Sequence, residues 1–365
     1  MKKVLIAIPN IFGGGAERVA SLWANSLREL GYQVAFLNSN YCDKEYPIDT
    51  SIQRFVLANT YAEYKSLGTL KTLSMIRKIV KDYRPDVLIN FLPHWQIAMM
   101  FATWGLKVKK IETVRNSPWS TYPNSKLQLW LWKKCFSRSK SVIVQANEQA
   151  LFFNKRIQKK CITISNPIDK RYETSFKTEY ANNIKNFVAV GRIDKQKNYP
   201  LMIQAFSELI DEGKDLTLSI YGVGKDDYTA KMQALIDQSG HAEKIKLMGR
   251  TSNVDQVFIN SDAFIMTSNH EGMPNALLEA MVAKLPCIST DCRTGPKDMI
   301  DDGINGFLAK TGDLESVKSC IRKVLELDKE KSQEIGEKAR EKIYELCSEQ
   351  NSLEKLSQLI NDCEK

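Results

Sequence analysis

Near its start the chain reads KVLIAIP at Lys3–Pro9 and GGGAER at Gly13–Arg18. The first run is apolar and predicts a buried strand, and Ala16–Leu30 has the apolar spacing of an amphipathic helix. The glycines between them predict a tight turn, needed either for packing or for close approach of a ligand to the backbone. Free N–H groups at the start of the following helix attract anions. The turn is not the dinucleotide fingerprint G-x-G-x-x-G, because Arg18 stands where its last glycine would be.

The alternation of strand and helix continues along the whole chain. Short β-rich runs alternate with helical patterns, which is typical of βαβ units and parallel sheets. We therefore predict an α/β fold with two Rossmann-like, doubly wound domains. The predicted connecting helices include Leu70–Tyr83, Tyr199–Asp211, Asn275–Ala283 and Leu314–Leu327. The predicted strands are Lys3–Pro9, Gln33–Asn38, Gln53–Leu57, Asp86–Leu92, Lys110–Val114, Ser141–Gln145 and Cys161–Ile164, then Phe187–Val190, Leu216–Tyr221, Lys244–Leu247, Ala263–Thr267, Pro286–Thr290 and Gly306–Ala309.

A length of 365 residues suits two domains, and the junction is marked by SNPID at Ser165–Asp169 followed by a polar, strand-poor stretch. We predict an N-terminal domain of residues 1–167 and a C-terminal domain of residues 168–345. Residues 346–365 are predicted to form a helix that packs back on the N-terminal domain. The carboxyl ends of both sheets are expected to face a central cleft, since ligands of such folds bind at strand ends.

The net charge of +9 is unevenly distributed. Residues 1–170 carry 26 lysines and arginines against 11 acidic residues, whereas the remainder carries 26 against 32. A basic half joined to an acidic half indicates that one domain faces a polyanion or an anionic membrane, or simply has a solvated basic surface.

The cysteines and the apolar runs indicate the cellular compartment in which the protein resides. The eight cysteines are scattered without a C-x-x-C pair or metal-ligand spacing, which favours a reduced, cytoplasmic setting. The apolar runs are too short to span a membrane, and the start lacks the cleavage site of a signal peptide.

A second group of functional residues follows the first predicted strand of the C-terminal domain. The loop reads GRIDKQKN at Gly191–Asn198. Arg192 offers a bidentate fork and Lys197 a point charge, so the two cations suit a diphosphate. Lys195 is an alternative to Lys197, and the loop is otherwise an exposed basic turn.

The third group reads EGMPNALLE at Glu271–Glu279 and crosses from a turn into a helix. Asn275 is predicted to cap this helix, and the amides of Asn275, Ala276 and Leu277 are predicted to point towards an anion. Glu279 is suited to accept hydrogen bonds from ribose hydroxyls. Taken in isolation, two glutamates on a helix more often form a solvated face.

Together and in this order, the three elements resemble the family-4 retaining glycosyltransferases of GT-B fold, which include many bacterial enzymes of polysaccharide and lipid-linked glycan assembly. The resemblance covers nearly the whole chain. It extends to the linker Asn166–Asp169 and to DCRTGPKD at Asp291–Asp298, although relatives often have glutamate in place of Asp298.

The resemblance implies roles for the donor-side residues. Arg192 and Lys197 would hold the donor pyrophosphate and stabilise the leaving group, and Glu271 would contact the transferred sugar. The remaining implied contacts are Glu279 with the ribose, the amides of Met248, Gly249 and Arg250 with the base, and Gly14 and Gly15 with the diphosphate.

On the acceptor side, His94 follows a predicted strand and is predicted to contact the sugar or to orient the acceptor hydroxyl. Its alternative is a loop histidine bonded to backbone. Arg115 and Asn116 stand at the end of another strand and are predicted to meet an acceptor pyrophosphate or the donor. Similar Arg-Asn pairs occur at this place in relatives from bacterial glycan assembly. The helix Lys126–Lys140 places tryptophans beside lysines, which suits either a membrane interface or core packing with a basic rim.

We therefore predict a retaining hexosyltransferase that moves a hexose or N-acetylhexosamine from a nucleotide diphosphate sugar, with UDP favoured. The acceptor is predicted to be a glycan or lipid-linked molecule of surface polysaccharide assembly, at the cytoplasmic face of an anionic membrane. No cofactor, metal or nucleic acid is expected, and the sequence has no D-x-D motif. The alternatives are a nucleotide-sugar epimerase of the same fold and a non-catalytic, basic, membrane-associated scaffold.

Overall fold

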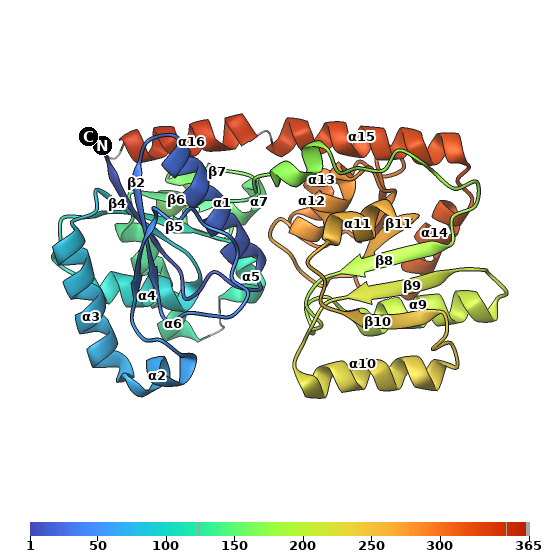
Figure 1. Ribbon diagram of the computed structural model, residues 1–365, viewed down its shortest axis with the longest axis horizontal. Helices are drawn as coiled ribbons and strands as arrows, with labels where there is room; N and C mark the ends of the chain where they lie inside the picture. Colours follow the sequence, from blue (N-terminus) through green and yellow to red (C-terminus); the bar gives the residue numbers. More distant parts are fainter. Residues whose placement is uncertain (123–124, 348, 363–365) are drawn as a thin grey trace. The chain divides into compact units, whose positions relative to one another are not determined.

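The computed structural model describes residues 1–122, 125–347 and 349–362, which form two compact units (Figure 1). Unit 1 comprises Met1–Pro167 together with Glu349–Lys365, and unit 2 comprises Ile168–Ser348. Each unit contains one parallel sheet with helices on its faces. Within the described ranges, no helix is both long and apolar enough to cross a bilayer.

The sheet of unit 1 has the strand order β3-β2-β1-β4-β5-β6-β7, and every pair is parallel. Strands β2 and β3 extend the sheet on one side of β1, and strands β4 to β7 extend it on the other side. A doubly wound sheet binds ligands at this reversal, between β1 and β4. The strands are β1 (Lys3–Ala7), β2 (Gln33–Asn38), β3 (Gln53–Val56), β4 (Val87–Asn90), β5 (Lys109–Thr113), β6 (Ser141–Val144) and β7 (Cys161–Thr163).

The strands of unit 1 are apolar on both faces because helices cover both. In β1, Val4 and Ile6 join the core formed with α1, whereas Leu5 and Ala7 join the core formed with α3 and α4. Such two-sided burial produces the near-continuous apolar runs of the sequence. The helices are α1 (Gly15–Glu29), α2 (Tyr61–Ser66), α3 (Gly68–Tyr83), α4 (Pro93–Ala102), α5 (Pro118–Thr121), α6 (Lys126–Arg138), α7 (Asn147–Ala150) and α8 (Lys155–Gln158).

The last helix, α16 (Glu349–Asn361), belongs to unit 1 and packs beside α1. Leu356 and Ile360 are fully buried in the same core as Val4 and Ile6. Lys2 Nζ donates to the carbonyl oxygens of Ile360 and Asn361, at 3.2 and 3.0 Å. A cation at the carboxyl end of a helix stabilises its exposed carbonyls. The first residues of the chain thus hold the last helix.

Unit 2 repeats the architecture with the strand order β10-β9-β8-β11-β12-β13. The order reverses between β8 and β11, which places its switch point there. The strands are β8 (Asn186–Val190), β9 (Thr217–Tyr221), β10 (Ile245–Gly249), β11 (Ala263–Met266), β12 (Cys287–Thr290) and β13 (Phe307–Ala309). The helices are η1 (Lys170–Glu173), α9 (Tyr199–Asp211), α10 (Asp226–Ser239), α11 (Val254–Ile259), α12 (Asn275–Val282), α13 (Pro296–Met299), α14 (Leu314–Leu325) and α15 (Lys329–Cys347).

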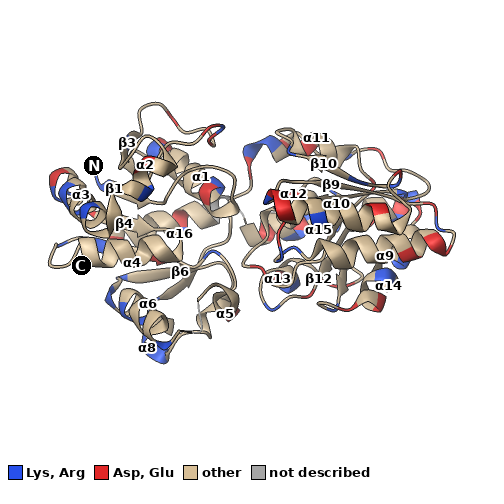
Figure 2. Ribbon diagram, turned by 90° about the horizontal axis from the view of Figure 1, so that it is seen from below, with Lys and Arg blue, Asp and Glu red and all other residues tan. Residues whose placement is uncertain are grey.

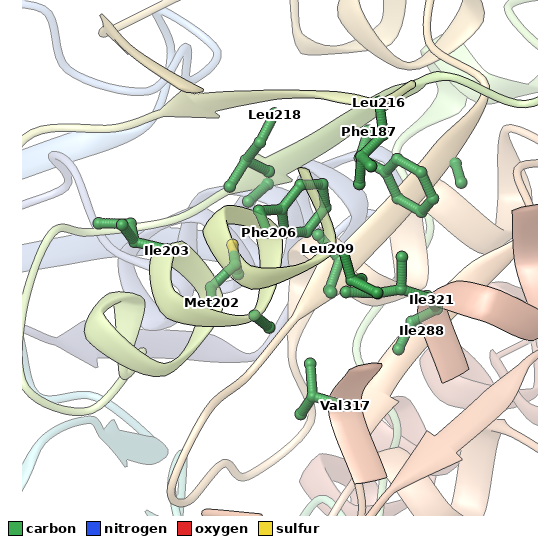
Figure 3. Close-up of a cluster of buried hydrophobic side chains, with 14 of the residues drawn as sticks. Phe187, Met202, Ile203, Phe206, Leu209, Leu216, Leu218, Ile288, Val317 and Ile321 are labelled. Atoms are coloured by element: carbon green, nitrogen blue, oxygen red, sulfur yellow. The ribbon is translucent and has the colours of Figure 1, made fainter. Parts of the chain in front are cut away.

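Figure 3 shows one face of the unit 2 core, where α9 packs against the sheet. The rings of Phe187 and Phe206 meet edge to face with centroids 5.2 Å apart. Leu209 and Leu218 complete the contact and are fully buried. Burying each such side chain contributes about 2 kcal/mol, so α9 is firmly seated behind the loop that precedes it. The predicted class, two Rossmann-like α/β domains, is confirmed.

Candidate functional site

Two loops meet at the switch point of unit 2. The loop Gly191–Asn198 follows β8, and the loop Thr267–Pro274 follows β11. Because β8 and β11 are adjacent parallel strands, their carboxyl ends bring both loops to one edge of the sheet. Two of the three predicted functional groups therefore lie side by side.

A set of hydrogen bonds fastens these loops to each other. The Thr267 hydroxyl contacts the carbonyls of residues 197 and 198, both at 3.1 Å. Asn269 donates from its side chain to the carbonyl of Lys195 at 3.0 Å, and from its backbone to the carbonyl of Gln196 at 2.8 Å. Gln196 Nε2 in turn donates to the carbonyl of His270 at 2.9 Å. The loops are therefore rigidly positioned without a ligand.

At the centre of these loops Lys197 forms an ion pair with Glu271, with Nζ and Oε1 2.7 Å apart. The two side chains are 13% and 7% exposed, so the pair is largely shielded from water. The lysine chain passes over Gly191, where a Cβ would come within 3.0 Å of Lys197 Cε. Removing one partner of such a pair would leave a buried, uncompensated charge, which is costly. Lys197 therefore offers its remaining N–H donors beside a carboxylate that is already hydrogen-bonded to it.

The turn that carries Glu271 is supported from behind by the segment after β12. The Thr294 hydroxyl donates to the carbonyl of Glu271. Gly295 has φ +93°, and a Cβ there would lie 2.3 Å from the carbonyl oxygen of Gly272, so only glycine fits. Burial raises the pKa of Cys292 to about 12, so this neighbouring thiol stays protonated.

Helix α12 begins at Asn275 with Pro274 in the N-cap position and no side-chain cap. The prediction that Asn275 caps this helix is wrong by one residue, because Pro274, with φ −74° and ψ 111°, takes the extended conformation of a cap. The first intrahelical bond runs from Leu278 N to the carbonyl of Pro274. Residues 275–277 therefore form the first turn of α12, at the positive end of the helix dipole.

Glu279 lies one turn further into α12 and is only 5% exposed. Its Oε2 accepts a hydrogen bond from the hydroxyl of Tyr172 at 3.2 Å. Tyr172 belongs to η1 and is fully buried. Tyr172 was not predicted as a site residue, because it lies in the polar stretch after the junction, which shows no periodic pattern.

Arg192, in contrast to Lys197, is a surface residue with a side chain 62% exposed. Its Nη2 lies 3.4 Å from Asp194 Oδ2. An exposed pair of this kind contributes little and leaves the guanidinium available to a ligand.

The loops after β9 and β10 complete this edge of unit 2. A Cβ on Gly222 would lie 1.8 Å from the carbonyl oxygen of Gly191, and one on Gly224 would lie 2.1 Å from that of Ile193. Both glycines are required by close packing of the loops. They were not predicted as site residues, although a G-x-G directly after a predicted strand is a usable signal. Gly249 has φ +72°, and its carbonyl oxygen accepts a hydrogen bond from the backbone N–H of Gly222 at 2.8 Å. Its neighbours Met248 and Arg250 are exposed at the same edge.

In unit 1 the glycine turn and His94 flank the switch point between β1 and β4. Gly14 is the N-cap of α1, and a Cβ there would lie 2.0 Å from Glu17 Oε2. Any larger residue at position 14 would therefore require the flexible carboxylate of Glu17 to move. His94 is exposed on the first turn of α4, directly after Leu92, which has the unusual φ of +65°.

Arg115 ends β5 with its guanidinium turned into unit 1. It lies over the rings of Trp23 and Phe91, 5.3 and 5.6 Å from their centroids, and Nη2 donates to Asn166 Oδ1. Burial lowers the pKa of Arg115 to about 9. Asn116 Oδ1 accepts from the backbone N–H of the next residue at 2.7 Å. The acceptor-side roles of Arg115 and Asn116 remain predictions.

Helix α6 has two contrasting faces. Trp132 is buried, and its Nε1 donates to the carbonyl of Pro93 at 3.1 Å. Leu127 and Trp130 are 66% and 54% exposed, and Lys134 Nζ lies 5.4 Å from the Trp130 ring. Lysines and arginines gather on α6 and α8 (Figure 2). One face therefore packs in the core while the other presents aromatic and basic groups.

Comparison with known proteins gives consistent matches. The model of Glycosyltransferase Family 4 matches residues 13–172, and that of Glycosyl transferases group 1 matches residues 170–342. The chain is 28% identical to the N-acetylgalactosamine-N,N'-diacetylbacillosaminyl-diphospho-undecaprenol 4-alpha-N-acetylgalactosaminyltransferase of Campylobacter jejuni, over 90% of this chain and 92% of that protein.

Solved structures share the fold. A variant of S. aureus TarM, in complex with fondaparinux, alpha-GlcNAc-glycerol and UDP, aligns with a TM-score of 0.81 and 15% identity, over 99% of this chain and 100% of that one. Anabaena HepE in complex with UDP and glucose aligns with a TM-score of 0.80 and 18% identity, also over 99% and 100%.

Proposed function

Because the chain belongs to the glycosyltransferases, with a family 4 domain followed by a group 1 domain, we propose that unit 2 binds a nucleotide diphosphate sugar at the edge that carries Lys197 and Glu271. The observation that carries this proposal is the shielded Lys197–Glu271 pair beside the start of α12. It combines a positive charge for phosphate with a carboxylate for sugar hydroxyls in one rigid site.

Departure of a nucleotide diphosphate concentrates negative charge on the leaving phosphates. Groups that are already oriented towards that charge stabilise it without reorganisation. In unit 2, Lys197, Arg192 and the amino end of α12 supply the positive charge at this edge of the sheet. On binding, the diphosphate takes Lys197 from Glu271, and the carboxylate is released to accept hydrogen bonds from the transferred sugar.

The remaining donor contacts follow from the positions of the strand ends. Glu279 binds the ribose, and the backbone around Gly249 and Arg250 receives the base. We favour UDP, a choice supported by the UDP named in the TarM and HepE complexes. The transferred group is a hexose or N-acetylhexosamine, with its anomeric configuration retained by attack on the same face.

The acceptor is a glycan or a lipid-linked glycan of surface polysaccharide assembly, bound at the carboxyl edge of unit 1. His94 orients the acceptor hydroxyl there, and Arg115 with Asn116 lies at the adjacent strand end. The name of the Campylobacter relative, which acts on a diphospho-undecaprenol, supports this class of acceptor.

Saturating UDP should raise the melting temperature of the protein by about 5–10 °C, and Arg192→Ala should remove most of this rise. The reason is that UDP binds only the folded state, and Arg192 supplies a bidentate contact to its phosphates. Differential scanning fluorimetry measures the shift. Lys195→Ala is the matched control, since it removes a neighbouring exposed cation and should leave the shift intact. A protein that responds to no nucleotide would instead fit the scaffold alternative.

A chelator should leave the transfer rate within about twofold of its starting value, because Lys197, Arg192 and the amides of α12 supply the positive charge at the diphosphate. The measurement is release of UDP with and without EDTA, after dialysis against the chelator. Strict dependence on a re-added divalent cation would contradict this prediction, because it would show that a metal ion is required at the diphosphate.

We also propose that the exposed face of α6 rests on the inner face of an anionic membrane, with Leu127 and Trp130 at headgroup level. Replacing both by serine should weaken binding to phosphatidylglycerol vesicles by about tenfold or more, because exposed apolar area and nearby cations both contribute. Vesicle sedimentation measures this. Leu70→Ser removes a leucine of α3 that is more exposed, at 84%, and serves as control. Equal loss of binding in this control would argue against a specific face.

A further inference from the structure

A hollow of about 530 Å³ opens at the amino ends of the unit 1 strands. Its wall includes Asp86 and Lys109, which stand at the starts of β4 and β5. His94 and Arg115 follow the opposite, carboxyl ends of the same strands. The five residues of β1 rise roughly 16 Å, so the hollow is separated from the predicted acceptor edge by the depth of the sheet.

The rim of this hollow is strongly positive. It carries Lys81, Arg84, Lys107 and Lys109. Across the part of the chain that the structure describes, these four side chains form no hydrogen bond or ion pair. The one carboxylate of the rim, Asp86, is already engaged, because its Oδ2 accepts from the backbone N–H of Lys3 at 2.8 Å. Clustered cations repel one another, and an anion bound among them relieves that repulsion.

Arg84 is held in an unfavourable backbone conformation at this rim. It ends α3 with φ +51° and ψ +61°, and its N–H donates to the carbonyl of Val80. Glycine is the residue favoured in this left-handed position, and another residue costs about 1 kcal/mol. Strained residues of this kind are concentrated at functional sites. Arginine at this position is therefore less stable than glycine would be, but it places a guanidinium on the rim of the hollow.

The floor beneath the cations is apolar. Leu106 and Val108 line it and are partly exposed to solvent. The site therefore suits a ligand that joins a phosphate to a small uncharged group. We propose that this hollow binds a glycerol phosphate or a similar phosphate monoester or diester, whether free in solution or as part of a phospholipid headgroup. The proposal is independent of the donor site in unit 2.

The test uses the full chain and two probes, soluble glycerol phosphate by titration calorimetry and phosphatidylglycerol vesicles against phosphatidylcholine vesicles by sedimentation. The variant is Arg84→Gly combined with Lys107→Ala. It should weaken binding of the responsive probe by about tenfold or more, because two of the four cations are lost. Arg84→Gly alone should keep or raise the melting temperature, so a loss of binding does not reflect misfolding.

The chain provides a matched control in Lys44→Gly. Lys44 is also a cation in the left-handed region, with φ +58°, and lies outside the hollow. This variant removes one charge and the same kind of strain but should bind like the wild type. Loss of glycerol phosphate binding in the double variant alone supports a soluble ligand, and loss restricted to the anionic vesicles supports a headgroup. Absence of binding to either probe, or equal binding by the double variant and Lys44→Gly, overturns the proposal.

Discussion

Replacing Glu271 by alanine is expected to lower kcat by about 10²–10³ while UDP binding is retained or becomes tighter. This carboxylate lies 2.7 Å from Lys197 Nζ. It therefore competes with the phosphates for the ammonium group, and its removal leaves Lys197 available to them. The sugar, however, loses its carboxylate contact in the transition state. Initial rates of UDP release and calorimetric titration with UDP measure the two effects separately.

Two further variants make this result specific. Glu271→Gln keeps the size of the side chain and should also lose turnover, since the charge is removed. Lys197→Met, unlike the Glu271 variants, should weaken UDP binding by about tenfold or more, because a buried carboxylate is left facing the phosphates. Turnover of Glu271→Ala near that of the wild type would place the residue outside the reaction. An epimer formed from the donor without acceptor would favour the epimerase alternative.

The second large effect concerns stability and arises from Glu112, a carboxyl buried in unit 1. Glu112 is 1% exposed, and its Oε1 accepts a hydrogen bond from Asn90 Nδ2 at 2.8 Å. Burial raises its pKa to about 7. The unfolded chain loses this proton near pH 4.5, whereas the folded chain keeps it until about pH 7. The free energy of unfolding should therefore fall as pH rises between these values, by about 3 kcal/mol in total.

Glu112→Gln removes the titration and should abolish this decline. At pH 8 the variant should be more stable than the wild type by about 3 kcal/mol, and at pH 5 the two should differ by less than about 1 kcal/mol. All six tryptophans lie between Trp23 and Trp132, so their fluorescence in urea follows unit 1 alone. Glu29→Gln, at an exposed position, is the control. An unchanged pH dependence in Glu112→Gln would show that another group causes it.

The strands could be predicted from sequence because a parallel sheet with helices on both faces has strands that are apolar at nearly every position. Runs such as VLIN of β4 and AFIM of β11 are buried at every position. Each predicted strand is present, with its ends within two residues of the observed ones. The short helices α5, α7 and α8 were not predicted, since four residues are too few to show a helical period.

The site could be predicted only as far as strand ends reveal it. Arg192, Lys197 and Glu271 lie in loops that follow two adjacent parallel strands, as the rule for such strands predicts, and their roles in donor binding stay predictions. The pairing of Lys197 with Glu271, 74 positions apart, depends on the adjacency of β8 and β11, which no local pattern encodes. The bond from Tyr172 to Glu279 spans 107 positions and depends on a segment without periodicity.

The return of α16 to unit 1 has a consequence for biosynthesis. Leu356, Leu359 and Ile360 complete a core whose other members, such as Val4 and Trp23, are translated first. The ribosome must therefore synthesise the chain beyond residue 360 before unit 1 can close its own interior, whereas the residues of unit 2 are already made by then. Nascent chains that stall before residue 350 should carry an open, apolar groove along α1 and be substrates for chaperones or proteases.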